Sequence, residues 1–139
     1  MLLLFFSALL INADASTLSE EYTITKGDYI AMQMNFYSAA AWGSLVEQTN
    51  TNVFAYYDPL SNRVYVELYG ISDTPEAAQA VMSQFLNVIK GNFIPALKRW
   101  EGIELLANEF TIVYRNRTEE GHRKIFMWED NKYKFPIGK

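Results

Sequence analysis

The sequence predicts an α+β domain in which two helices pack on an antiparallel sheet of five or six strands. Three observations indicate this class: a helical pattern between residues 73 and 100, a hairpin pattern over residues 53–69, and a three-strand pattern over residues 110–135. Half of the 139 residues are hydrophobic and 15% are aromatic, which is typical of a chain with a packed core. A chain of this length suits one domain.

The clearest element is the helix predicted from Asp73 to Trp100. Asp73 or Thr74 can cap its start, and Pro75 fits the first turn, where its missing N–H costs nothing. Apolar residues recur in steps of three and four, which aligns them on one side of a helix. These residues are Ala78, Met82, Phe85, Ile89, Phe93, Ala96 and Trp100.

Pro95 lies inside this helical pattern. A proline removes one helical hydrogen bond, and its ring presses on the carbonyl four residues earlier, here that of Gly91. We therefore expect a bend near Gly91 that lets the long helix follow a twisted sheet.

Two elements are predicted before residue 50. A short β-like run from Tyr22 to Thr25 is a candidate edge strand, and a second helix is predicted from Tyr29 to Glu47, with Asp28 as its cap. No charged residue lies between Asp28 and Glu47, so this helix is expected to be largely buried. Residues 30–36 also alternate at strand period, but the Ala, Met and Gln content favours a helix.

A hairpin is predicted from two runs, Val53–Tyr57 and Arg63–Tyr69, on either side of a turn that contains Pro59. With the Tyr22 strand counted, the element order matches a split βαββαβ (ferredoxin-like) plan with one added C-terminal strand. Without that strand, the order is two helix-plus-hairpin units.

The last three strands, residues 110–117, 123–129 and 132–135, form a predicted meander. If Arg117 faces His122, strand alternation divides the apolar side chains between both faces. One face carries Ile112, Tyr114, Ile125 and Met127, and the other carries Val113, Phe126, Trp128, Tyr133 and Phe135. Two helices on one side cannot cover both faces, so one face is expected to meet a partner or ligand.

Residues 1–15 are predicted to be a signal peptide. An apolar block from Leu2 to Ile11 is too short to span a bilayer and is followed by Ala13-Asp14-Ala15, so we expect cleavage after Ala15. No Lys or Arg precedes the block, which departs from the usual pattern. The prediction is a periplasmic or secreted protein with a single domain over residues 16–139 and no membrane span after cleavage.

Several chemistries are excluded or disfavoured by composition. The chain has no cysteine, so it has no disulfide and no thiol nucleophile, and His122 is its only histidine. No phosphate-binding glycine loop and no serine-nucleophile motif occurs, and we expect no cofactor and no bound metal. A formal net charge of −4 argues against a nucleic-acid partner.

The favoured function is a non-catalytic binding or interaction module that uses the aromatic meander face. Its candidate binding residues are Phe126, Trp128, Tyr133, Phe135 and Arg115. The expected partner is a protein, a peptide, or a small apolar or sugar ligand. Both predicted helices have outer faces that are polar but almost uncharged, which suggests a homo-oligomer.

Two alternatives belong to other classes. One is a small hydrolase or metal-assisted enzyme that uses Glu101, Glu104 or Glu109 together with His122. The other is a structural accessory subunit of an envelope assembly. Separately, residues 116–118 (Asn-Arg-Thr) match the N-glycosylation sequence, which matters only in a eukaryotic secretory pathway.

Overall fold

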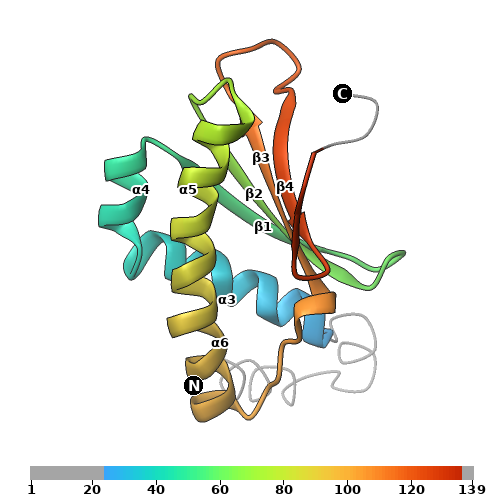
Figure 1. Ribbon diagram of the computed structural model, residues 1–139. Coiled ribbons are helices and arrows are strands. Elements are labelled where there is room, and N and C mark those ends of the chain that lie inside the picture. The colour runs from blue at the N-terminus through green and yellow to red at the C-terminus, as the bar shows by residue number, and fades with distance from the viewer. Residues whose placement is uncertain (1–23, 136–139) are drawn as a thin grey trace, which may run out of the picture.

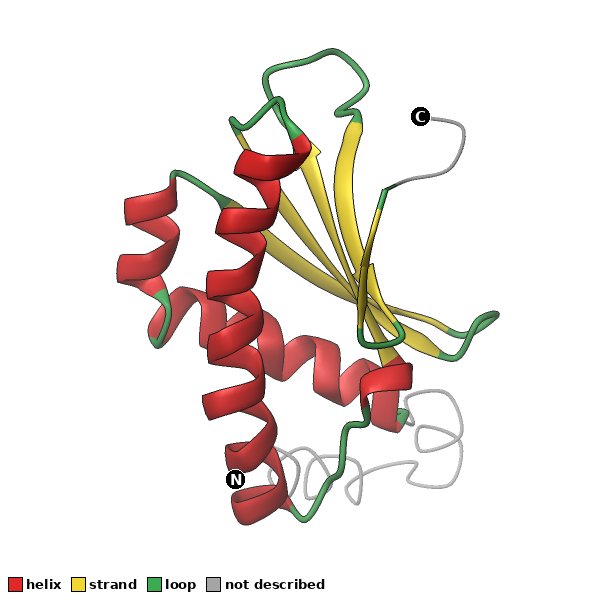
Figure 2. Ribbon diagram, in the orientation of Figure 1, coloured by secondary structure: helices red, strands yellow, loops and turns green. Residues whose placement is uncertain are grey.

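The computed structural model describes residues 24–135, which form three helices packed on one face of a five-stranded mixed sheet (Figures 1 and 2). The predicted α+β class is confirmed. The predicted signal peptide, residues 1–15, lies outside the described residues. The segments α5 (Pro75–Val88) and α6 (Ile94–Ala96) belong to one continuous helix over residues 75–101, which we call the long helix. The other two helices are α3 (Lys26–Ala40) and α4 (Gly43–Thr49), and the strands are β1 (Asn52–Asp58), β2 (Arg63–Gly70), β3 (Phe110–Asn116), β4 (Lys124–Glu129) and β5 (Lys132–Lys134).

The strands lie in the order β1-β2-β3-β4-β5, so each strand pairs with its neighbours in sequence. Three pairs are antiparallel, and the central β2–β3 pair is parallel. A parallel pair needs a long connection, which the α5 helix and its continuation provide. The ferredoxin-like plan is not confirmed, because the strand order is sequential. Of the candidate edge strand, Tyr22 and Thr23 lie outside the described residues, and Ile24 and Thr25 lead directly into α3.

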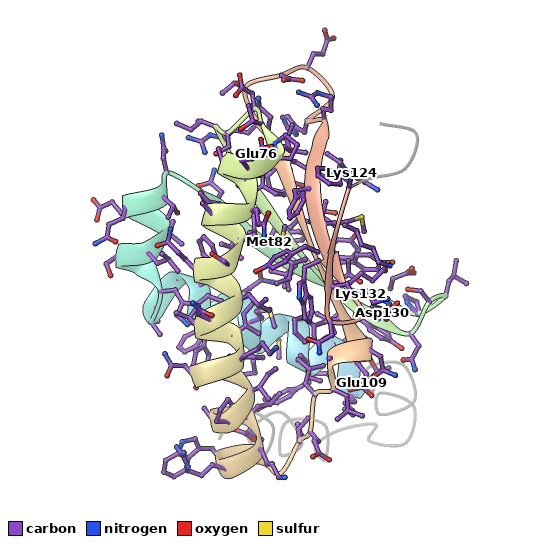
Figure 3. All side chains as sticks on the ribbon, in the orientation of Figure 1. Glu76, Met82, Glu109, Lys124, Asp130 and Lys132 are labelled. Atoms are coloured by element: carbon purple, nitrogen blue, oxygen red, sulfur yellow. The ribbon has the colours of Figure 1, made fainter. Side chains whose placement is uncertain are left out.

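Both predicted hairpin regions are confirmed. In the β1–β2 turn, the Asp58 carboxylate accepts hydrogen bonds from the Leu60 N–H at 3.2 Å and from the Ser61 hydroxyl at 2.9 Å. The β4–β5 turn uses Asp130 and Asn131, both at positive φ, as a two-residue hairpin turn of type I′ requires. Figure 3 labels Asp130 and Lys132 at this turn.

The helix predicted from Tyr29 to Glu47 is instead two helices, α3 and α4, with a break at Ala41 and Trp42. The Trp42 indole is buried and lies 6.1 Å from the Tyr37 ring and 6.2 Å from the Phe93 ring. Burying this large side chain against the long helix fixes the position of the break. Gly43 then starts the second helix.

The start of α3 also differs from the prediction. Thr25, not Asp28, is the N-cap: its hydroxyl accepts the Asp28 N–H at 3.1 Å and donates to the Asp28 carboxylate at 2.8 Å. The acid in the first turn therefore supports the cap residue rather than serving as the cap.

The long helix begins as predicted. Thr74 is its N-cap, with its hydroxyl accepting the Ala77 N–H at 3.2 Å. The irregularity expected near Gly91 is a π-helical turn over Ile89–Phe93, and a second π-helical turn over Leu97–Glu101 ends the helix at Gly102. Wider turns of this kind appear where the regular hydrogen-bond ladder is interrupted, which is what Pro95 does.

One hydrophobic core lies between the helices and the sheet. Figure 3 shows Met82 extending from α5 toward the strands. The fully buried members of this core come from α3, the long helix, β2 and β3. They are Ile30, Met34, Met82, Phe85, Ile89, Phe93, Val66, Leu68, Phe110, Ile112 and Tyr114.

A β-bulge changes the predicted faces of the meander. Arg115 pairs with Lys124, as the expected hairpin register requires, but Tyr114 pairs with Phe126, so Ile125 is an extra residue. Beyond the bulge, each β4 residue pairs with β3 one position away from the predicted register, so its side chain lies on the opposite face from the one predicted. Phe126 and Trp128 consequently lie on the helix side, and the prediction that they face away from Ile112 and Tyr114 is wrong.

A side chain from α3 caps the outer edge of the sheet. The Asn35 side chain donates to the Ala55 carbonyl at 2.8 Å and accepts the Ala55 N–H at 2.8 Å. Ala55 is on β1, the edge strand, and its backbone groups would otherwise be open to pairing with another strand. The amide of Asn35 thus acts as a substitute for a neighbouring strand at this point.

We expect Asn35→Ala to destabilise the fold by about 1–3 kcal/mol, because the Ala55 N–H and C=O lose their partners. Urea unfolding measures the loss, and hydrogen exchange should show reduced protection of the Ala55 amide. Asn87→Ala, an exposed position on α5, is the control and should leave both unchanged. Unaltered protection at Ala55 would contradict the capping role.

We expect Gly70→Ala to cost roughly 1–3 kcal/mol, because an added Cβ would overlap the buried Tyr114 hydroxyl, which accepts the Ser72 N–H at 3.0 Å. Gly91→Ala is the matched control, since a Cβ there meets no atom within 4 Å. At this exposed helical site alanine should be neutral or stabilising by up to about 1 kcal/mol. Equal stabilities of the two variants in urea would refute the packing argument.

Candidate functional site

The face of the sheet opposite the helices, which we call the open face, is covered by no helix or strand from residues 24–135 (Figure 2). Strand alternation places on it the side chains that alternate with the core residues. Two rows cross all five strands. One row is Phe54, Glu67, Val113, Met127 and Lys134, and the other is Tyr56, Tyr65, Thr111, Glu129 and Lys132.

Three rings at the β1–β2 end of the open face form what we call the aromatic ladder: Phe54, Tyr56 and Tyr65. The Tyr56 ring lies 5.9 Å from Phe54 and 5.4 Å from Tyr65, with interplanar angles of 27° and 12°. Phe54 remains 54% exposed and Tyr56 37% exposed. Large aromatic rings left in water next to each other are unusual for a surface without a partner.

Glu67 lies in the middle of the open face and is only 6% exposed. Its carboxylate accepts hydrogen bonds from the Tyr69 hydroxyl at 2.6 Å, the Tyr56 hydroxyl at 3.3 Å and the Arg115 Nε at 2.9 Å. A nearly buried carboxylate needs such compensation, since desolvating it without partners would cost several kcal/mol. Glu67 thus holds two tyrosines and one arginine in fixed positions on this face.

The two phenols bound to Glu67 have raised pKa values. The pKa of Tyr69 is raised to about 12. Burial is the largest cause, and the hydrogen bond to Glu67 and the negative charge of Glu67 contribute less. Burial and the charge of Glu67 also raise the pKa of Tyr56. Both phenols therefore stay protonated and act as hydrogen-bond donors at neutral pH.

The β3–β5 part of the open face is covered by side chains that form ion pairs with one another. Glu129 lies 3.9 Å from Arg63 and 3.2 Å from Lys134, and it accepts a hydrogen bond from the Thr111 hydroxyl at 3.1 Å. Thr111 itself is buried beneath these longer side chains. The charged end of the face is thus largely neutralised, whereas the aromatic ladder is not covered.

The structure does not bring the five candidate binding residues together. Phe126 and Trp128 are 3% and 2% exposed in the core on the helix side. Tyr133 and Phe135 are exposed beside them, with ring centroids 5.6 and 5.3 Å from Phe126. Arg115 is on the opposite face, bound to Glu67. The bulge at Ile125 causes this separation.

The residues proposed for catalysis are also separate. Glu104 pairs with Lys98 at 3.4 Å, and Glu109 lies 3.7 Å from Lys26 and accepts the Leu106 N–H at 3.0 Å. His122 is exposed in the β3–β4 loop, with its ring against Tyr69. Within residues 24–135, no group of three or more His, Asp or Glu side chains is placed to share a metal ion.

Asn116 of the glycosylation sequence is 2% exposed. Its side-chain amide donates to the Glu119 carboxylate at 3.2 Å, and its carbonyl oxygen accepts from the Thr118 N–H and hydroxyl at 2.9 and 2.6 Å. The side chain is therefore occupied with stabilising the β3–β4 loop in the folded protein.

Comparison with protein-family models, with curated proteins and with solved structures gives no match to this chain. Among residues 24–135, no helix has both the length and the apolar character needed to cross a membrane.

Sequence reasoning missed the aromatic ladder. The alternation of the second hairpin strand does place Tyr65, Glu67 and Tyr69 on the face opposite the core. The same alternation in the first strand would have added Phe54 and Tyr56. The aromatic residues of the C-terminal meander are more numerous than those of the first hairpin, and the sequence pattern therefore favours the meander.

We expect Glu67→Gln to lower the pKa of Tyr69 from about 12 toward 10, although burial alone keeps it somewhat raised. Ultraviolet titration of tyrosinate, with Tyr69→Phe used to assign the transition, measures this change. The variant should also lose about 1–3 kcal/mol of stability, because Arg115 keeps no carboxylate partner. Glu120→Gln, at an exposed position, is the control.

The same cluster predicts a pH dependence of stability. The Tyr69 phenol holds its proton to a higher pH in the folded than in the unfolded chain, so its contribution is complete below pH 10. That contribution is lost as the pH rises through about 12. Tyr69→Phe should lose less stability over this interval than the wild type, and identical profiles would contradict the raised pKa.

Proposed function

We propose that this protein is an exported, non-catalytic binding module whose open face recognises a protein or an extended peptide. The observation that carries the proposal is the exposed aromatic ladder on the face of the sheet that the helices do not cover. Export remains a proposal from the N-terminal sequence pattern.

The residues around the aromatic ladder support recognition of a partner. Phe54 and Tyr56 offer apolar area with few rotatable bonds, so little side-chain entropy is lost when a partner covers them. The Tyr56 and Tyr69 hydroxyls are held by Glu67, and the guanidinium of Arg115 is held by Glu67 and by the His122 carbonyl at 3.1 Å. Tyrosine and arginine at fixed positions are typical of the energetically dominant residues of interfaces.

The shape of the face favours a macromolecular partner over a small molecule. Small ligands are usually enclosed in hollows. Two hollows in the described part of the chain, one lined by Gly27 and Tyr57 and one by Met32 and Phe36, lie beside α3 and not on the open face. A peptide or a protein surface can cover a broad, flat area of side chains. Within residues 24–135, no group of three or more His, Asp or Glu side chains is placed to share a metal ion, so the metal-assisted alternative gains no support.

The test uses a displayed library of random 12-residue peptides selected on the immobilised mature protein. Enriched peptides are then measured by fluorescence anisotropy against the wild type and the double variant Phe54→Ala, Tyr56→Ala. We expect a loss of at least about tenfold in affinity, equal to about 1.4 kcal/mol, since the variant removes most of the exposed ring area.

Leu60→Ala is the matched control, because Leu60 is 97% exposed in the β1–β2 turn and belongs to neither row of the open face. Its affinity should equal that of the wild type, and circular dichroism should show that all variants are folded. Enriched peptides that bind the double variant as tightly as the wild type would overturn the proposal.

A further inference from the structure

A hollow of about 350 Å³ lies where α3 meets the end of the long helix, separate from the open face. Its lining residues Tyr29, Met32, Gln33 and Phe36 recur along one side of α3, and Glu101 comes from the last turn of the long helix. Met32 is 40% exposed and Phe36 is 65% exposed. The volume is within the range of small-molecule sites, and the wall is mostly apolar.

The Tyr29 hydroxyl is a buried polar group that lines this hollow. Tyr29 is 3% exposed, and its hydroxyl makes no hydrogen bond with any described residue. Buried hydroxyls without a partner are rare in folded proteins and call for an explanation. Burial, followed by the charge of Glu101 and by the proximity of its carboxylate as an acceptor, raises the pKa of Tyr29, so the phenol is protonated and able to donate toward Glu101.

Glu101 also lacks a charged partner in the described part of the chain. Lys98, on the same helical turn, contacts Glu104 at 3.4 Å instead. The hollow thus combines an apolar wall on α3 with an uncompensated carboxylate at its end. This arrangement is complementary to a molecule that has an apolar body and a positively charged head.

We propose that this hollow binds a cationic amphiphile, with its alkyl part along Met32 and Phe36 and its ammonium group on the Glu101 carboxylate. Tyr29 is a positioning residue in this proposal: its hydroxyl donates to the carboxylate once that group is held against the ligand. The hollow shares no residue with the open face, so a negative result for the hollow would not contradict the proposed function, and the reverse also holds.

Decylammonium is the probe, and decanoate is its counterpart of opposite charge and equal length. The protein is labelled with ¹³C at its methionine methyl groups, because Met32 lines the hollow, Met34 and Met82 are in the core, and Met127 is on the open face. We expect decylammonium, below its micelle concentration, to shift the Met32 signal in a saturable manner. Decanoate should bind at least about tenfold more weakly.

Glu101→Gln should remove most of this preference for the cation, while Phe36→Ser should weaken both probes. Glu104→Gln is the control for charge, since Glu104 is exposed and does not line the hollow. Equal binding of the two probes, an unmoved Met32 signal, or an unchanged preference in Glu101→Gln would each overturn the proposal. A shift of Met127 alone would place the amphiphile on the open face and also overturn it.

Discussion

The parallel pairing of β2 with β3 is the constraint on which the rest of this structure depends. Parallel neighbours cannot be joined by a tight turn, so the chain must travel back along the sheet before β3 begins. The long helix makes that return on one face, and α3 packs beside it on the same face. Both hairpins are thereby covered from one side only, and the side chains of the other face must satisfy one another.

The open face meets this requirement with polar contacts at its centre and at its β5 end. Glu67 binds Tyr56, Tyr69 and Arg115, and Glu129 binds Arg63, Lys134 and Thr111. Such networks shield the sheet and fix its side chains, but they leave ring area exposed at the β1–β2 end. A surface with fixed, exposed aromatic groups loses little freedom when it binds, which is why we propose a recognition role for it.

Local signals predicted most of the fold. The cap at Thr74, the periodicity of the long helix and the turn residues of the hairpins act over a few residues, so they can be read directly from the sequence. The break before Gly43 and the extra residue at Ile125 could not be predicted, because each is decided by tertiary packing. One bulged residue reverses the faces of a strand, and here it turns Trp128 into the core. Phe54 and Tyr56 are then the exposed aromatic residues of the open face.

The contact between Asn35 and Ala55 has a consequence for assembly. A sheet with two free borders can add molecules at both sides and grow without limit, as fibrils do. Here the amide of Asn35 occupies one border, and the short lysine-flanked strand β5 forms the other. A strand added along β1 would have to displace Asn35 from Ala55, so this architecture disfavours the pairing at both borders that open-ended polymers need.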